Sequence, residues 1–182
     1  MNDTEMRLRP YKSCDAKKIV SWIRDEEALY KWSADRYNKY PISADDINHK
    51  YLKCNGDCEE EDNFYPLTAE VGGRVIGHLM LRYTNGDKNT LRVGFVIVDD
   101  SMRGQGYGKK MLKMAEDYAF GILKAKRLTL GVFENNPSAY HCYKAAGFCE
   151  IKTEDLIFEI KGEKWRCIEM EMRPKSVDSD AG

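Results

Sequence analysis

The chain of 182 residues lacks an excess of charge of either sign, because 29 Lys and Arg side chains stand against 30 Asp and Glu. A protein that binds nucleic acid generally needs a basic face to neutralise phosphates, so this balance predicts that nucleic acid is not a partner. The chain also lacks an apolar run long enough to span a membrane, so no membrane contact is expected. No apolar segment follows the first residues, which predicts that there is no secretory signal and that the location is cytoplasmic.

Closely spaced metal ligands are also scarce. Of six cysteines and three histidines, only Cys54 and Cys58 form a close pair, and they lie in an acidic stretch. Structural zinc sites use two such pairs, so we expect no metal. Because the chain is not small and shows no export signal, reduced thiols are predicted rather than disulfides. No cysteine is marked as an activated nucleophile.

What is present suits a single folded domain. Apolar residues make up 42% of the chain, which is enough for a core, and we predict one domain over residues 1–172 with a disordered polar tail over 173–182. The first part predicts a strand over 6–11 and a helix over about 14–24 that Ser13 caps. Ser43 is predicted to cap a second helix, since two aspartates follow it in the first turn.

Two stretches between these elements each have two interpretations. Residues 29–40 have no clean periodicity, and their four aromatic side chains either wall a substrate pocket or pack the first helices on the sheet: Tyr30, Trp32, Tyr37 and Tyr40. The acidic run 57–62 is predicted to be a solvated loop, with steering of a cationic substrate as the less favoured alternative.

The second part of the chain predicts a sheet that is crossed by helices. Residues 64–71, 74–83 and 90–98 read as an antiparallel meander with a hairpin turn at Gly72-Gly73. A helix follows the glycine-rich segment 104–108, and a buried strand is predicted over 127–133. A helix capped by Asn136 with Pro137 at its first position ends at Gly147. Strands over 148–160 and 164–172 are expected to close the fold.

The glycine-rich turn carries the strongest chemical signal. Arg103-Gly104-Gln105-Gly106-Tyr107-Gly108-Lys109 lies between an apolar strand and an amphipathic helix. Glycines let backbone N–H groups approach an anion, and a helix start adds a positive dipole end, so this turn predicts a phosphate site. It matches neither the triphosphate loop nor the dinucleotide fingerprint. A tight turn without a ligand is the alternative that the turn alone leaves open.

Two spaced motifs resemble the GNAT superfamily of acetyl-CoA-dependent N-acyltransferases. The family's phosphate loop, Arg/Gln-x-x-Gly-x-Gly/Ala, is matched at every fixed place from Arg103 to Gly108. About thirty residues later the family has a strand, an Asn, and a short helix that bears a Tyr and ends in Gly-Phe. Here these are Asn136, Tyr143 and Gly147-Phe148. The resemblance covers residues 64–172 well and the first sixty residues only loosely.

The resemblance implies a cofactor, a binding mode and a fold. Acetyl-CoA would be the cosubstrate, with its pyrophosphate on the glycine turn and its pantetheine arm in a gap between two splayed strands. The fold would be mixed α/β (α+β): a twisted, mostly antiparallel sheet with helices on both faces, with the gap between its fourth and fifth strands. The cofactor-binding residues would be Val96, Ile97, Val98, Arg103, Gly104, Gln105, Gly106, Tyr107, Gly108, Lys109, Asn136 and Tyr143.

The implied reaction is direct attack of a neutral amine on the thioester, with no acyl-enzyme. Backbone N–H groups near 95–97 would bind the oxyanion, and Tyr143 would be the general acid for the leaving thiolate. The base is less clear, because the two places where relatives carry a carboxylate are Arg92 and Gly131 here. Glu134 is the candidate catalytic base, and His78 and Glu70 are weaker candidates.

We therefore predict an N-acetyltransferase that moves an acetyl group from acetyl-CoA to an unidentified amine on a small molecule or protein. The alternative is a non-catalytic acyl-CoA-binding or sensing module on the same fold, which the missing carboxylates favour and the retained Tyr143 opposes. A nucleotide-binding regulatory domain is disfavoured by the failed loop patterns. The family often dimerises, so a homodimer is an open expectation.

Overall fold

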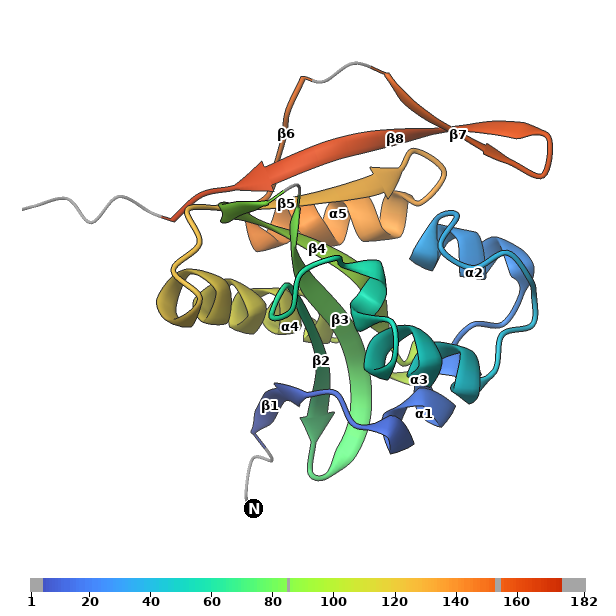
Figure 1. Ribbon diagram of the computed structural model, residues 1–182, viewed down its shortest axis with the longest axis horizontal. Helices are drawn as coiled ribbons and strands as arrows, with labels where there is room; N and C mark the ends of the chain where they lie inside the picture. Colours follow the sequence, from blue (N-terminus) through green and yellow to red (C-terminus); the bar gives the residue numbers. More distant parts are fainter. Residues whose placement is uncertain (1–4, 85, 153–154, 175–182) are drawn as a thin grey trace, which may run out of the picture.

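The computed structural model describes residues 5–84, 86–152 and 155–174. Its centre is one eight-stranded sheet in the order β1-β2-β3-β4-β5-β8-β6, with β7 also paired to β8 (Figure 1). All neighbouring strands are antiparallel except β4 and β5, which are parallel. The strands are β1 (Met6–Pro10), β2 (Phe64–Val71), β3 (Arg74–Thr84), β4 (Asp87–Val98), β5 (Arg127–Phe133), β6 (Cys149–Glu150), β7 (Leu156–Ile160) and β8 (Glu163–Met172).

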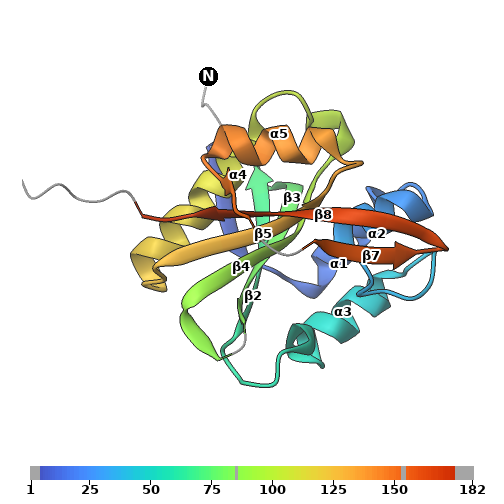
Figure 2. The same cartoon turned by 90° about the horizontal axis from the view of Figure 1, so that it is seen from above.

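Helices cover both faces of this sheet, which confirms the predicted fold class (Figure 2). On one face lie α4 (Tyr107–Asp117), which continues into a π-helical turn η4 (Tyr118–Ile122), and α5 (Pro137–Ala146). On the other face lie α1 (Ala16–Ser21), α2 (Glu26–Ser33) and α3 (Ala44–Leu52), preceded or followed by short 3-10 turns. None of the helices in the described residues is both long and apolar enough to cross a membrane.

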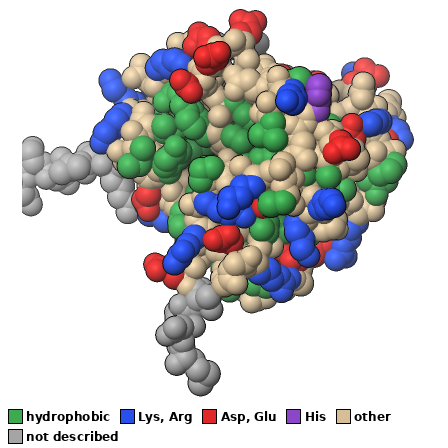
Figure 3. Space-filling model, turned by 60° about the horizontal axis from the view of Figure 1, so that its bottom comes forward, with side chains coloured by type: hydrophobic (Ala, Val, Ile, Leu, Met, Phe, Trp, Pro, Cys, Tyr) green, Lys and Arg blue, Asp and Glu red, His purple; other side chains and the backbone are tan. Residues whose placement is uncertain are grey.

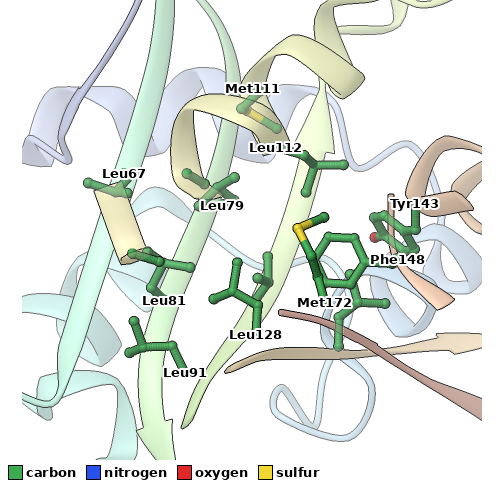
Figure 4. Packing of buried hydrophobic residues seen from close by; sticks show 14 of the residues in the cluster. Leu67, Leu79, Leu81, Leu91, Met111, Leu112, Leu128, Tyr143, Phe148 and Met172 are labelled. Atoms are coloured by element: carbon green, nitrogen blue, oxygen red, sulfur yellow. The ribbon is translucent and has the colours of Figure 1, made fainter. Parts of the chain in front are cut away.

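Each face has its own hydrophobic core because side chains alternate along the strands. Leu79 and Leu81 of β3 point to the α4–α5 side, where they meet Met111 of α4 and Leu128 of β5 (Figure 4). Residues between them, such as Met80, point to the side of α1, α2 and α3. A one-residue shift of β3 would exchange the two sets, so both cores fix its register.

The helix starts follow capping chemistry, with one correction. Ser43 caps α3 as predicted, and Asp46 completes a capping box by accepting from the Ser43 backbone N–H. The predicted cap at Ser13 is wrong. Ser13 lies inside a 3-10 turn, η1 (Ser13–Asp15), and the carboxylate of Asp15 accepts from the backbone N–H of Lys12 instead.

The helix α2 was not predicted from residues 29–40. It begins after Asp25, whose side chain accepts from the Ala28 N–H, and its first turn carries Glu26 and Glu27. These are ordinary helix-start signals. They lie just before the aromatic stretch, whose lack of periodicity concealed the helix.

The last part of the sheet also departs from expectation. One strand over 148–160 was predicted, but the structure has two short strands, β6 and β7, on the same edge of β8. The turn at Lys161-Gly162 is confirmed between β7 and β8. The predicted domain boundary coincides with the end of β8 at Met172, while most of the predicted disordered tail lies outside the described residues.

The feature that positions the site is the separation of β4 from β5. These strands pair only at Thr90–Arg92 with Arg127–Thr129, and then diverge. In β4 the register against β3 shifts between His78 and Met80, which is a β-bulge around Phe95. Phe95 has a φ of 51°, which is uncommon for a bulky residue and typical of functional sites. The predicted gap between the fourth and fifth strands is therefore confirmed.

The surface carries charges of both signs (Figure 3). Over the face shown in Figure 3, acidic and basic side chains are interspersed, and hydrophobic side chains gather toward one side. All six cysteines are free thiols. Among the described residues there is no group of three or more His, Cys, Asp or Glu side chains that is able to hold a metal ion.

Candidate active site

A cavity of about 680 Å³ occupies the gap between β4 and β5. Its walls come from the glycine turn, the diverging strands, the start and middle of α5, and α2 with the segment after it, together with Met80 and Arg82 of β3, Phe158 of β7 and Cys167 of β8. A volume of this size is in the range of sites for small molecules and cofactors. It brings together every residue predicted to bind the cofactor except Gln105, and it includes Tyr143 but none of the three candidates for the base.

The glycine turn forms one end of this cavity. Gly104 and Gly106 have φ values of 75° and 82°, which only glycine adopts without strain, and Gly106 is the residue that precedes α4. The first N–H groups of α4 have no partner within the helix, so they are available to an anion at this end. Arg103 and Lys109 also line this end and add positive charge.

Gly108 has a different reason to be glycine. A Cβ there would lie 3.1 Å from the Cys142 Sγ of α5, so its absence lets the start of α4 approach the middle of α5. Asn136, which caps α5, and Ser138 line the same cavity as the glycine turn.

The middle of the cavity is bounded by the open edges of the two strands. Val96, Ile97 and Val98 of β4 line it, as do Leu130 and Phe133 of β5. Beyond the short paired segment, β4 and β5 do not bond to each other, so backbone groups on these edges face the cavity. An extended ligand arm can add itself to such an edge as a strand would.

Tyr143 lies on α5 at this middle section. It packs beside Phe148 and Met172 in the core, and its ring is 6.3 Å from that of Phe148 (Figure 4). It also lines the cavity although it is only 8% exposed. Burial raises the pKa of its hydroxyl above the ordinary value, so Tyr143 keeps its proton at neutral pH.

The far end of the cavity is aromatic and basic. Trp32 of α2 lines it and lies 5.0 Å from Phe95, centroid to centroid, while Tyr37 stacks behind Trp32 at 5.9 Å. Tyr40 instead donates to the Arg24 carbonyl away from the cavity. The aromatic stretch thus serves both predicted roles: Trp32 walls the pocket, and Tyr37 packs the helix.

Of the two places where relatives carry a carboxylate, Arg92 forms an ion pair with Glu169 that passes over the other, Gly131. Arg92 reaches across Gly131 to Glu169 of β8 and donates two hydrogen bonds of 2.7 Å to its carboxylate. A Cβ on Gly131 would lie 2.7 Å from the Arg92 Nη2 and 2.8 Å from the Glu169 Oε1. The glycine is needed because the pair passes over it. No sequence pattern points to Glu169, because only the pairing of β5 with β8 brings it opposite Gly131.

Several predicted residues lie elsewhere. Gln105 is outside the cavity lining, and its side chain donates to the Ser101 carbonyl. Glu134 is half exposed, outside the lining, and accepts a 2.6 Å hydrogen bond from Arg166. His78 is fully buried against Tyr51, and Glu70 pairs with Arg9. No residue of the acidic run 57–62 lines this cavity.

Comparison with known proteins points to one family. The spermidine N(1)-acetyltransferase of Vibrio cholerae is 34% identical over 148 residues, which is 81% of each chain. The spermine/spermidine N(1)-acetyltransferase of Bacillus subtilis is 31% identical over 100 residues, which is 52% of this chain and 66% of that protein. In structure, the V. cholerae enzyme in complex with CoA and spermine superposes with a TM-score of 0.74 at 23% identity, over 92% of this chain and 95% of that one.

A family model completes the evidence. Residues 26–148 match the model of the acetyltransferase (GNAT) family, and this range holds the glycine turn, both diverging strands, and α5 with Tyr143. The match confirms the family to which the sequence motifs pointed, a family of acetyl-CoA-dependent N-acetyltransferases. The chain belongs to the acetyltransferase (GNAT) family.

Proposed function

We propose that this protein transfers the acetyl group of acetyl-CoA to a primary amine that enters at the aromatic end of the cavity. The observation that carries the proposal is the continuity of the cavity from the glycine turn, past Tyr143, to Trp32. One end suits a pyrophosphate and the middle suits an extended arm, which leaves the far end for the acceptor.

The reaction proceeds by direct attack. The neutral amine nitrogen attacks the thioester carbonyl carbon, and the oxyanion that forms is held by backbone N–H groups at the bulge around Phe95. The carbon–sulfur bond then breaks, the Tyr143 hydroxyl gives its proton to the CoA thiolate, and the tyrosinate takes up a proton from solvent. The ammonium proton leaves to solvent, so the products are the N-acetyl amine and CoA. Residues 96–98 and 103–109, with Asn136, hold the coenzyme in this proposal.

Two routes are open to the proton that the attacking amine loses. Glu134 remains the prediction from sequence, although its carboxylate is engaged by Arg166 at 2.6 Å and lies outside the cavity lining. Loss of the proton through solvent in the open cavity needs no such residue. The fraction of a primary amine that is neutral increases with pH, so acetylation should be faster at high pH.

Two further properties belong to the same proposal. A spermidine N-acetyltransferase from V. cholerae, whose structure is described as dodecameric, superposes over 97% of this chain with a TM-score of 0.71 at 20% identity. We infer that this chain also self-associates, with the homodimer as the smallest such assembly, and light scattering tests it. The six free thiols favour a reducing compartment such as the cytoplasm.

Thermal unfolding with and without acetyl-CoA tests the coenzyme site. Ligand at about 100 times its dissociation constant adds about 2.7 kcal/mol to the unfolding free energy, which for a domain of this size is a rise of about 5–10 °C. Gly106→Glu should abolish the rise, because its side chain fills the anion site.

Gly73→Glu is the matched control. Gly73 has a φ of 78°, close to the 82° of Gly106, and both have open space where a Cβ would be, but Gly73 lies in the β2–β3 turn. It should lower the midpoint through the same backbone strain and leave the rise with acetyl-CoA intact. No rise in the wild type would refute the proposal. A rise without turnover of any amine would instead support the non-catalytic acyl-CoA-binding alternative.

A further inference from the structure

The cavity has more basic than acidic side chains in its lining although the whole chain is nearly neutral, and three of the basic ones already pair with carboxylates: Lys31 with Glu27, Arg92 with Glu169 and Arg103 with Asp100. Its lining contains one acidic side chain, Asp35, and six basic ones. Arg103 and Lys109 lie at the glycine turn, where phosphates are proposed to bind. The other four line the acceptor end: Lys31, Arg36, Arg82 and Arg92.

Two of these arginines are placed in an unfavourable position. Arg82 of β3 and Arg92 of β4 are directly opposite each other in the antiparallel register, so both side chains stand on the acceptor face of the sheet. Like charges in this arrangement destabilise a sheet. Among the described residues, Glu169 neutralises Arg92 but no carboxylate forms an ion pair with Arg82 or Arg36.

The burial of Arg82 adds to this destabilisation of the sheet. It is partly buried, and burial lowers the pKa of its guanidinium, with Arg36 and Arg92 lowering it further. Asp57 and Cys58 act in the opposite direction, more weakly. A desolvated charge is normally paired, so a guanidinium that no carboxylate of the described residues neutralises, at a cavity wall, is suited to an anion brought by a ligand.

Resting on the proposed function, we infer that the acceptor is an amine that also carries an anionic group, a carboxylate or a phosphate, which Arg82 binds with the help of Arg36. A guanidinium matches the geometry of both anions. The same charges repel a polyamine, which is cationic along its length. The acceptor therefore differs in class from the spermidine and spermine for which the curated relatives are named.

Binding of the anion by Arg82 agrees with the direction in which the cavity runs along β4. Arg82 and Arg92 lie where β4 begins to leave β5, and the open edge at Val96 and Ile97 lies further along the same strand. An anion on Arg82 leaves the amine of the same molecule facing that edge. There the nitrogen attacks the acetyl carbonyl, CoA leaves with the proton from Tyr143, and the ammonium proton goes to solvent.

Matched amines test the inference with acetyl-CoA at saturation. L-Methionine is compared with L-methioninamide for a carboxylate, O-phosphoethanolamine with ethanolamine for a phosphate, and spermidine is the polyamine. CoA and the acetylated amine are measured by chromatography, because the exposed Cys14 and Cys149 would react with a thiol reagent. The anionic member of at least one pair should have a kcat/KM about 10- to 100-fold higher than its neutral partner.

Arg82→Gln should remove this preference by raising KM for the anionic amine, while the thermal shift with acetyl-CoA stays. It should also raise the unfolding midpoint, because it removes one of the two opposed charges. Arg7→Gln is the control, since Arg7 is an exposed arginine on β1 and outside the cavity. A higher kcat/KM for spermidine or for the neutral partners, or a preference that survives Arg82→Gln, would overturn the inference.

A second measurement decides the matter if no amine in the panel reacts. With the coenzyme site saturated by CoA and ionic strength held constant with chloride, inorganic phosphate should raise the unfolding midpoint of the wild type and of Arg7→Gln. The rise should be lost in Arg82→Gln, and equal rises in all three proteins would overturn the inference. A failure of the proposed function is distinguishable, because it appears as no thermal shift with acetyl-CoA.

Discussion

Adding a single methyl group at Gly131 should destabilise the protein by breaking the geometry of the Arg92–Glu169 pair. A Cβ at this place would lie 2.7 Å from the Arg92 Nη2, 2.7 Å from the Cys167 Sγ and 2.8 Å from the Glu169 Oε1. Gly131 has no positive φ, so backbone strain is not the cause of the expected loss. The cost comes only from the crowded side chains.

The magnitude follows from what has to move. Arg92 and Glu169 hold each other through two hydrogen bonds, and Glu169 is only 12% exposed, so neither side chain has a free alternative position. Overpacking of this kind costs about 1–3 kcal/mol. For a chain of this length, about 2 kcal/mol lowers the midpoint of thermal unfolding by about 4–8 °C. Urea unfolding of Gly131→Ala should show the same loss at an unchanged slope.

Two further variants isolate the cause. Gly121→Ala is the control, because a Cβ at Gly121 meets nothing within 4 Å and the residue has no positive φ, so this change should be neutral or slightly stabilising. In the background of Arg92→Ala with Glu169→Ala, Gly131→Ala should cost much less, since only the Cys167 contact remains. An equal cost in both backgrounds would refute the reasoning.

Two predictions concern single side chains. Tyr143→Phe should lower kcat by about 100- to 10,000-fold, because the thiolate loses its proton donor, while the thermal shift with acetyl-CoA persists; an unchanged kcat in steady-state assays would remove Tyr143 from the mechanism. For His78, burial lowers the pKa from 6.5 to about 3. Between pH 3 and pH 6.5, His78 is therefore protonated in the unfolded chain and neutral in the folded chain. The unfolding free energy should therefore fall as the pH drops through this window, by about 1.4 kcal/mol per pH unit, and His78→Gln should flatten that slope in urea titrations at several pH values. The same slope in both proteins would mean that another group is responsible.

Local rules accounted for much of this fold. The glycine turn, the strand 127–133 and the helix from Pro137 to Gly147 were all predicted with nearly their observed limits. Each has signals within a few residues: glycines with positive φ, an Asn cap, or a continuous apolar run. The helix α2 has similar signals at Asp25 and Glu26, but the aromatic stretch that follows them has no helical period and hides the helix.

Other features needed contacts between distant residues. The predicted strand 148–160 divides into β6 and β7, because both pieces pair with separate parts of β8. The bulge at Phe95 depends on the register of β4 against β3. Neither is visible in the residues of the segment itself.

The sequence by itself determined the proposed coenzyme end of the site, because a turn suited to phosphate is built from consecutive residues and its glycines are constrained locally. Only the tertiary structure decided the acceptor end. Arg82 meets Arg92 through a cross-strand register, and Glu169 reaches Arg92 across a third strand, over a glycine that leaves room for it. Such pairings join residues far apart in the chain. They leave an unbalanced positive charge that exists only after the sheet has formed. We propose that the acceptor carries the matching negative charge.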